Sequence, residues 1–359
     1  MKHLVIRNLG PLKEADVELK RINVIIGSQS SGKSCVLKTA CYCTWVEKRI
    51  ELTQTTDFFA KDGNFLKELE RFHKLKGYIK DDTFISYESD FMSFSFDNKA
   101  KEFTFEWKEG RWNYKRSKVT YIPAERNLVA AIPNWFQVKF ADDNIRDFMA
   151  DWSQARYSAV IDVPILNLGV SYHYNIGSKM DEVWISDKEK LDFFNTSSGL
   201  QSLIPLFVHL NYILNNETAS DYDSLESKEE QMAVMTVLVD VNKPESYPNF
   251  ILTHFCDIFL EEPEENLFPP TQSRLVEWML DGIKGEKQGS RYDLPSNLFI
   301  ATHSPYILNA FMEKQDIDMT LLYTRTSDGL ITVKTATEQD FQDIYDYGVD
   351  AFFNIETLG

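Results

Sequence analysis

One eight-residue segment, GSQSSGKS at residues 27–34, limits the folds open to this chain more than any other feature. It follows the apolar run INVII and precedes CVLKTACYC, which is typical of the start of a buried helix. A simple turn would account for the two glycines, because Gly and Ser favour turns. It would not account for Lys33 and Ser34. With Gly27 and Gly32, these residues fill every fixed position of the phosphate-binding pattern G-x-x-x-x-G-K-[ST].

Each fixed residue of this phosphate loop has a physical role. The loop turns successive backbone N–H groups inward, and the helix beginning near Gly32 directs the positive end of its dipole to the same place. Lys33 is expected to reach the β- and γ-phosphates, and the hydroxyl of Ser34 to bind Mg²⁺. The residues expected to bind the nucleotide here are Gly27, Ser28, Gln29, Ser30, Ser31, Gly32, Lys33, Ser34 and Cys35.

The composition limits the class of protein. The chain has 359 residues, 43% of them hydrophobic, so it can form one large or two medium domains with a substantial core. A net charge of −17 argues against an extended surface that coats nucleic acid, although a local basic groove stays open. No apolar run approaches the roughly 20 residues of a membrane span, and the N-terminus lacks the apolar region of a signal peptide. We therefore expect a cytoplasmic protein without a membrane segment.

The four cysteines fit no zinc-binding spacing. Three of them lie on or near the helix after the phosphate loop, where small buried side chains pack well. Core thiols in a reducing cytoplasm are the expected interpretation. The residues are Cys35, Cys41, Cys43 and Cys256.

Alternating apolar residues predict three regions of β-structure. The first is a hairpin that has GPLK as its turn and leads into the strand INVII. The second is a meander over residues 83–120, in which KEGR forms a hairpin turn and RWNYKR, residues 111–116, the next strand. The third is a hairpin formed by LGVSYHYN and EVWISD.

Helices are expected elsewhere. Residues 215–246 are acidic and turn-rich, and we expect a surface excursion with one short helical piece, EEQMAVMTVLVDV. No internal repeat or run of heptads of coiled-coil length is present. The other expected helices run from Ser34 to about residue 50, within residues 51–80, over residues 135–160, and from about Leu200.

A second chemical stretch, CDIFLEEPEENLFP, places an apolar strand directly before two acids. A nucleotide hydrolase needs one carboxylate near Mg²⁺ and a second that orients and deprotonates the attacking water. Glu261 is expected to hold the metal and Glu262 to be the general base. A solvated acidic loop is the alternative, which Pro263 weakens because it ends the strand sharply. Asp257, in the middle of the run, is expected to have a structural role.

Three further segments place polar residues at the ends of predicted elements. In SSGLQ, Ser198 and the N–H of Gly199 form a second candidate anion site at the start of a predicted helix. If this segment is considered alone, ordinary helix capping by Ser198 is the better interpretation. The presence of the other motifs reverses that preference and favours an anion site. His303 ends the strand NLFIAT and is expected to sense the γ-phosphate through a hydrogen bond. Arg126, after the strand VTYIP, touches phosphate, relays the nucleotide state or forms a surface salt bridge.

Basic and aromatic residues alternate near the end of the predicted meander. Such interleaving can bind nucleic acid, but it is also typical of a half-exposed strand, which we favour. The basic residues are Lys108, Arg111, Lys115, Arg116 and Lys118.

Taken in order, several stretches resemble the ABC-type ATPases of the SMC/RecF/OLD group. The chain is most similar to the short prokaryotic AAA-family (OLD-like) ATPases of anti-phage defence systems. Glu261 stands where an Asp is common, and the OLD-like group also carries a Glu at this position. Asn266 and Phe268 stand where that group often carries His. The stretches are IRNLGPLKEADVELKRINVIIGSQSSGKS, YIPAER, SSGLQSLIPL, EEPEENLFP and ATHSPYIL.

The resemblance implies roles for these residues. Residues 27–34 would be the Walker A loop, Glu261 and Glu262 the end of Walker B, and His303 the switch histidine. Ser198–Gly199 would be the signature loop, and Arg126 would lie near the Q-loop position. In this group two heads dimerise head to tail, so that the phosphate loop of one chain and the signature loop of the other enclose the same ATP.

The expected fold is therefore α/β, an ABC-ATPase head with a P-loop parallel core sheet, an antiparallel β subdomain and a helical lobe. Residues 1–134 and 246–359 would form lobe I, and residues 135–245 lobe II. The implied function is a Mg²⁺-dependent ATP switch that forms a dimer or a higher oligomer. It would control a separately encoded nuclease or toxin, because no nuclease cluster is visible. The alternatives are an ATP-binding scaffold without turnover and a repair ATPase that acts directly on DNA.

Overall fold

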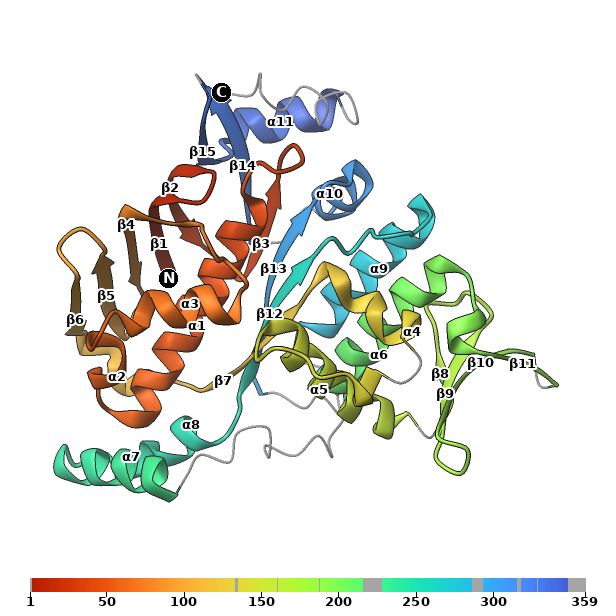
Figure 1. Cartoon of the computed structure of the whole chain (residues 1–359), viewed down its shortest axis with the longest axis horizontal. Coiled ribbons are helices and arrows are strands. Elements are labelled where there is room, and N and C mark those ends of the chain that lie inside the picture. Colours follow the sequence, from red (N-terminus) through yellow and green to blue (C-terminus); the bar gives the residue numbers. More distant parts are fainter. Residues whose placement is uncertain are drawn as a thin grey trace.

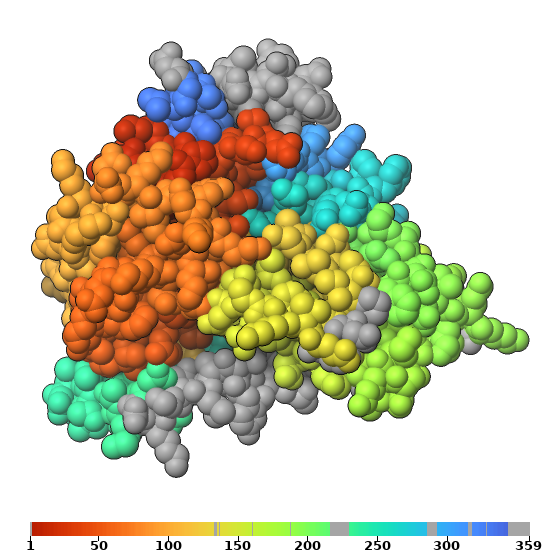
Figure 2. Space-filling view, viewed as in Figure 1, coloured from red at the N-terminus to blue at the C-terminus, as the bar shows by residue number. Residues whose placement is uncertain are grey.

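The computed structural model describes residues 2–132, 135–159, 161–186, 188–215, 228–285, 293–314, 318–327 and 329–347. Across these residues an eleven-stranded mixed sheet runs through the molecule (Figure 1). A four-stranded antiparallel sheet lies to one side, and part of this region protrudes from the molecule in the space-filling view (Figure 2). No helix in these ranges is long and apolar enough to cross a membrane.

The large sheet combines a parallel and an antiparallel half. Its strand order is β6-β5-β4-β1-β2-β15-β14-β3-β13-β12-β7. The strands from β14 to β7 are mutually parallel, whereas those from β6 to β2 form an antiparallel meander. The hairpin β14–β15 joins the halves, because β15 pairs in parallel with β2. The strands are β1 Lys2–Leu9, β2 Leu12–Leu19, β3 Ile22–Ile26, β4 Ile79–Glu88, β5 Met92–Asp97, β6 Glu102–Trp107, β7 Ser117–Ile122, β12 Phe255–Glu261, β13 Asn297–Thr302, β14 Met319–Ser327 and β15 Leu330–Thr335.

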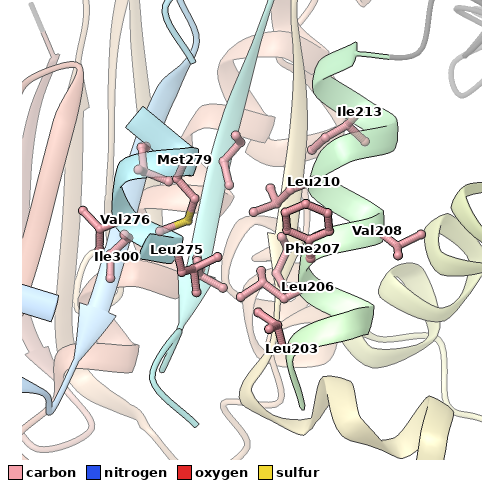
Figure 3. Packing of buried hydrophobic residues seen from close by; sticks show 14 of the residues in the cluster. Leu203, Leu206, Phe207, Val208, Leu210, Ile213, Leu275, Val276, Met279 and Ile300 are labelled. Carbon is pink, nitrogen blue, oxygen red and sulfur yellow. The ribbon is translucent and has the colours of Figure 1, made fainter. Parts of the chain in front are cut away.

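Two hydrophobic cores lie on opposite faces of the parallel half, because successive residues of a strand point to opposite faces. Ile25 and Phe259 belong to the core that contains helix α1 (Lys33–Thr53), whereas Val24 and Ile300 belong to the core that contains helices α6 (Ser198–Asn215) and α9 (Pro269–Gly282). Figure 3 shows part of this second core, in which Leu206 of α6 points toward Leu275 of α9, whereas Val208 points to the other side of α6. Both faces of the parallel strands are therefore covered, which leaves the ends of the strands for chemistry.

The remaining elements complete the two layers and the small sheet. The helices are α1 Lys33–Thr53, α2 Asp57–Ala60, α3 Asn64–Phe72, α4 Leu128–Ala131, α5 Asn144–Ser158, α6 Ser198–Asn215, α7 Lys228–Asp240, α8 Tyr247–Ile251, α9 Pro269–Gly282, α10 Pro305–Met312 and α11 Glu338–Tyr347. The small sheet has β8 Val163–Pro164, β9 Ser171–Asn175, β10 Met180–Ser186 and β11 Glu189–Asp192.

The expected fold class is confirmed: the molecule has a parallel core sheet, an antiparallel β subdomain and a group of helices on the far face. The hairpin with the GPLK turn, the hairpin formed by LGVSYHYN and EVWISD, and the helix after the phosphate loop are also present, whereas KEGR does not form the expected hairpin turn. All four cysteines are free and buried, as expected for core thiols. The division into two lobes by residue number stays a prediction.

The segment RWNYKR does not form the expected strand. A 3-10 helix, Glu109–Asn113, follows β6 instead, so the meander ends there. The guanidinium of Arg111 stacks on the rings of Trp107 and Trp112, at 3.3 and 4.3 Å from their centroids. Gly110 allows the tight turn, since a Cβ there would lie 2.5 Å from the carbonyl oxygen of Asp90. The next strand, β7, pairs in parallel with β12 at the other edge of the sheet.

The acidic excursion contains a helix that is partly buried. Residues 216–227 of the excursion lie outside the described residues. Helix α7 packs against α1, and Val234 and Leu238 are buried with Tyr114 and Phe250 in a small third cluster. The predicted helical piece is therefore correct, but one of its faces belongs to the core.

His73 is a buried histidine in the core formed with α1 and β7. It is 0% exposed, its ring lies against Tyr42 and Tyr121, and neither ring nitrogen has a hydrogen-bond partner among the described residues. Burial, with a smaller effect of the positive charge of Lys38, lowers the pKa of His73 from 6.5 to about 3. The folded protein therefore holds a neutral imidazole.

This burial predicts acid sensitivity. The unfolded chain takes up a proton near pH 6.5 and the folded chain only near pH 3, so stability should fall as the pH drops between these values. For His73→Phe we expect the decrease in the free energy of unfolding from pH 7 to pH 5 to be smaller by about 2 kcal/mol. Urea unfolding at both pH values measures this, with exposed His3→Gln as the control. Equal losses in the wild type and His73→Phe would contradict the prediction.

Candidate functional site

The carboxyl ends of the parallel strands bring the predicted residues to one edge of the sheet. The phosphate loop leaves β3 after Ile26, which pairs with Thr302 of β13 and Tyr323 of β14. Glu261, at the end of β12, pairs with Ala301. Segments far apart in the sequence therefore end side by side, as expected for parallel strands.

The phosphate loop is folded around its own lysine. The ammonium of Lys33 donates to the carbonyl oxygens of Gly27 and Ser28, at 3.0 and 2.7 Å. The side chain is buried, and burial lowers its pKa from 10.5 to about 8, against the opposing effect of the negative charges of Glu262 and Glu264. The charge expected to meet phosphate is thus held inside the loop, on carbonyl groups that an anion could replace.

Gly27 and Gly32, the two fixed glycines of the phosphate loop, are required for different structural reasons. A Cβ at Gly27 would lie 1.8 Å from the hydroxyl oxygen of Thr324 on β14, so the strand leaves no room for a side chain. Gly32 has a φ of 87° and lies against Leu12 of β2. The same Thr324 donates to the hydroxyl of Ser31 at 2.7 Å, and Ser31 donates to the carbonyl of Ser28 at 2.7 Å. The contact of Thr324 with the phosphate loop was not predicted from the sequence. Thr324 supports the loop from the side of β14.

The residues of the phosphate loop differ in their exposure to solvent. Ser28, Gln29, Ser30 and Ser34 are exposed, so their polar groups face solvent. Cys35 is buried in the core, and burial raises the pKa of its thiol to about 12. Its side chain is therefore a packing group, and only its backbone remains for contact with an anion.

Glu261 and Glu262 have different environments, as two adjacent residues at a strand end should. Glu261 is 5% exposed, its Oε1 accepts no hydrogen bond from the described residues, and the ammonium of Lys38 lies 3.9 Å from that atom. Glu262 is more open, with a backbone φ of 43°, and its Oε1 lies 3.2 Å from Nε2 of His303. That hydrogen bond lowers the pKa of Glu262 despite partial burial. The predicted base and the predicted switch residue are in direct contact.

Asp257 has the structural role that was expected. Its buried carboxylate accepts hydrogen bonds from Ser117 at 2.6 Å and Asn297 at 2.8 Å, which lie on the two neighbouring strands. The residue therefore fixes the far end of β12 between β7 and β13.

Glu264 lies beside the predicted residues, and its contacts were not predicted from the sequence. Its Oε1 accepts from the backbone N–H of His303 at 2.6 Å, and its Oε2 accepts from the hydroxyl of Thr302 at 2.8 Å. Its place three residues after Glu261 in an acidic run gives no indication of these contacts, because they depend on how the turn folds back.

Arg126 is buried, so the surface salt bridge considered for it is wrong. Its guanidinium lies 3.7 Å from the carboxylate of Glu265, and burial lowers its pKa against the effect of that acid. Its guanidinium therefore links α6 to the end of β12, and its expected roles in touching phosphate or relaying the nucleotide state stay predictions. The carbonyl acceptors belong to Pro123, Ser202, Glu261 and Glu262.

Ser198 and Gly199 form the first turn of α6. Ser198 is exposed, and the hydroxyl of Ser197 accepts from the N–H of Leu200 at 3.4 Å. Among the described residues, a Cβ at Gly199 would meet only the carbonyl oxygen of Asn266, at 3.1 Å. This helix end therefore contacts the turn after β12, and its role as a second anion site stays a prediction.

No protein-family model and no curated protein sequence matches the chain. Among solved structures, the chain is similar to an SMC head domain from Thermotoga maritima, with 10% identity, a TM-score of 0.44 and coverage of 93% of this chain and 98% of that one. It is similar to an SmcHead bound to the C-winged helix domain of ScpA, with 13% identity, a TM-score of 0.44 and coverage of 95% and 99%. It is also similar to an Smc head domain with a coiled coil and joint from Pyrococcus yayanosii, with 7% identity, a TM-score of 0.40 and coverage of 96% and 99%.

The basic residues near β7 do not form a shared open groove. Arg116 is 1% exposed and donates to the carbonyl of Ile251, and Lys118 is buried beside Asp151 at 3.4 Å. Lys108 pairs with Glu88, and Lys115 lies 4.0 Å from Asp293. With Arg111 stacked on two tryptophans, each of these cations already has a partner within the chain.

Proposed function

We propose that this protein is an ATP-hydrolysing switch that uses Mg²⁺ and dimerises head to tail. The observation that carries the proposal is the convergence at one sheet edge of the phosphate loop, Glu261, Glu262 and His303. A buried lysine inside a phosphate loop, with the carboxylate of Glu262 near it, supplies both the anion-binding and the base functions that phosphoryl transfer to water requires.

ATP binding would replace the contacts that Lys33 makes within its loop. The β- and γ-phosphates would take the places of the Gly27 and Ser28 carbonyls around the ammonium. Backbone N–H groups of the loop and the start of α1 would donate to the same anion. Thr324 and Ser31 would hold the loop in place from the side away from the phosphates.

The donor set near the loop fits a hard divalent cation. The hydroxyl of Ser34 is exposed at the start of α1, and Oε1 of Glu261 is a buried carboxylate oxygen that accepts no hydrogen bond from the described residues. Oxygen donors of this kind suit Mg²⁺. Bound there, Mg²⁺ would neutralise charge on the phosphates, with Ser34 and Glu261 as its protein ligands. No group of three or more His, Cys, Asp or Glu side chains within the described ranges forms a protein-only metal site.

Glu262 is proposed as the general base. Its carboxylate is ionised at neutral pH and can accept a proton from water, and the hydrogen bond from His303, which lowers its pKa, holds it in place. His303 would orient Glu262 and contact the γ-phosphate, so that loss of the phosphate changes the position of β13. Arg126, which holds carbonyls of both α6 and the end of β12, would pass that change to α6.

The proposed partner is a second copy of the chain, whose Ser198 and Gly199 would close on the ATP. Two aromatic residues stand exposed close in sequence to the catalytic residues: Phe268 is 73% exposed after the turn of Glu262, and Tyr306 is 43% exposed just after His303. Exposed aromatic side chains are typical anchors of protein interfaces.

Phe268→Ala is expected to weaken the ATP-dependent dimer by at least about 10-fold, because an aromatic anchor would be lost from the interface. Since Phe268 is exposed in the monomer, the melting temperature without nucleotide should barely change. Analytical ultracentrifugation with Mg²⁺-ATP in the Glu262→Gln background measures the effect, and Met232→Ala, at an equally exposed position on α7, is the control. A dimer as stable as that of the parent would exclude Phe268 from the interface.

The direct test of the proposed function is phosphate release by the purified protein with ATP and Mg²⁺. Retention of ATP and dimerisation without release of phosphate would instead indicate the scaffold alternative. The DNA alternative has less support, since the basic residues near β7 are paired within the chain. Salt-dependent DNA binding that is lost on neutralising them would restore it.

We also propose that the switch controls a separately encoded nuclease or toxin in anti-phage defence. The support for this part is the resemblance of the ordered motifs to the OLD-like group. Co-purification of the protein with the product of a neighbouring gene, dependent on ATP, is the experiment that tests it.

A further inference from the structure

The side chain of Glu264 joins the turn after β12 to the end of β13. Both carboxylate oxygens are used: Oε1 accepts from the N–H of His303 at 2.6 Å and Oε2 from the hydroxyl of Thr302 at 2.8 Å. Hydrogen bonds to an ionised carboxylate are among the stronger ones in proteins, and two of them fix its orientation as well as its distance. Glu264 therefore binds two consecutive residues of the neighbouring strand.

The backbone adds a third link between the same segments. The N–H of Glu262 donates to the carbonyl of Ala301 at 2.8 Å, so residues 262–264 hold residues 301–303 at three successive positions. Glu262 itself has a φ of 43°, in the left-handed region that L-residues rarely adopt. Such a conformation persists only where the surroundings fix it, and these links, with the bond from Arg126 to the Glu262 carbonyl, are what fixes it here.

The consequence is the relative position of two side chains. We call the three hydrogen bonds between residues 262–264 and residues 301–303 the Glu264 clamp. Glu262 and His303 belong to the two segments that this clamp joins, and their Oε1 and Nε2 atoms are 3.2 Å apart. We propose that Glu264 is a positioning residue that sets this distance, and so keeps the base and the switch histidine aligned for hydrolysis. The inference rests on the proposed function, because it assigns a task to a residue within that site.

Two other roles for Glu264 fit the contacts less well. Capping of α10 is already provided by Ser304, whose hydroxyl accepts from the N–H groups of Tyr306 and Ile307 at 3.1 and 3.3 Å. Direct acid or base catalysis would compete with two short hydrogen bonds that already occupy the carboxylate. The neighbouring acid, Glu265, contacts Arg126 and belongs to the other side of the turn.

Two substitutions separate positioning from charge. Glu264→Ala removes both contacts, and we expect kcat for ATP hydrolysis to fall about 50-fold with KM for ATP within about 3-fold, because small displacements of reacting groups cost this much. Glu264→Gln keeps an oxygen for the His303 N–H and an amide that can donate to the Thr302 oxygen, so we expect kcat within about 5-fold of the wild type. Glu277→Ala, which removes an exposed pair with Lys314 between α9 and the end of α10, is the matched control.

A nucleotide-free measurement makes the test independent of turnover. Hydrogen exchange at the backbone N–H of His303 should be at least about 10-fold faster in Glu264→Ala than in the wild type, and nearly unchanged in Glu264→Gln. Wild-type kcat retained in Glu264→Ala would overturn the proposal, and so would equal losses in both Glu264 variants. A wild type that releases no phosphate would refute the proposed function instead, while unchanged exchange in Glu264→Ala would refute the clamp itself.

Discussion

Glu262→Gln is expected to lower the rate of ATP hydrolysis by about 10³-fold while leaving ATP bound. The amide has almost the same shape as the carboxylate but cannot accept a proton from water. Glu262 is partly open and contacts His303 only through its side chain, so the substitution should not disturb the fold. With hydrolysis blocked, ATP and Mg²⁺ should shift the protein to the dimer, which size-exclusion chromatography with light scattering detects.

The control for this variant is Glu277→Gln, which also neutralises a glutamate but lies on the exposed side of α9. It should hydrolyse ATP at the wild-type rate. Hydrolysis by Glu262→Gln within about 5-fold of the wild type would remove Glu262 from the role of general base. Loss of ATP binding in this variant would show that Glu262 acts on affinity rather than on the chemical step.

Lys33→Met is expected to weaken ATP binding by at least about 100-fold, because the charge-assisted hydrogen bonds to the phosphates are lost. The same change should alter the free energy of unfolding without nucleotide by less than about 1 kcal/mol, since removing a desolvated ammonium offsets the loss of its two bonds to the Gly27 and Ser28 carbonyls. Methionine also fills a similar volume.

Unfolding in urea with and without Mg²⁺-ATP measures both effects. At a concentration about 100 times the dissociation constant, ATP should stabilise the wild type by about 2.7 kcal/mol and Lys33→Met hardly at all. Lys61→Met, at an exposed lysine on the far end of α2, should behave as the wild type does. Equal stabilisation of Lys33→Met and the wild type would contradict the phosphate role of this residue.

The parts of the fold that were predicted from sequence are those with local signals. Three kinds of pattern each predict the structure of their own segment of the chain. They are the glycine spacing of the phosphate loop, the apolar runs of β3, β12 and β13, and the acids and the histidine at the ends of β12 and β13. Because parallel strands end at one edge, these local signals together were enough to place Glu262 and His303 near each other. The structure adds that they are in contact.

What could not be predicted depends on contacts between distant residues. The hydroxyl of Thr324 reaches Ser31 across 293 positions of sequence, and Glu264 reaches Thr302 across 38. Arg111 stacks on tryptophans within a 3-10 helix where the alternating pattern had predicted a strand, and α7 of the acidic excursion packs against α1. In each case the local pattern was compatible with several structures, and packing decided between them.

The pairing of β15 with β2 makes the two halves of the large sheet mechanically continuous. One hydrophobic core joins the parallel strands to α5, α6 and the four-stranded sheet, so the boundary between these layers is tightly packed. Polar contacts cross it as well: the guanidinium of Arg126 binds the carbonyls of Ser202 and Glu261, and Thr120 of β7 meets His209 of α6 at 3.2 Å. A shift at the end of β12 would therefore have to move α6 with it.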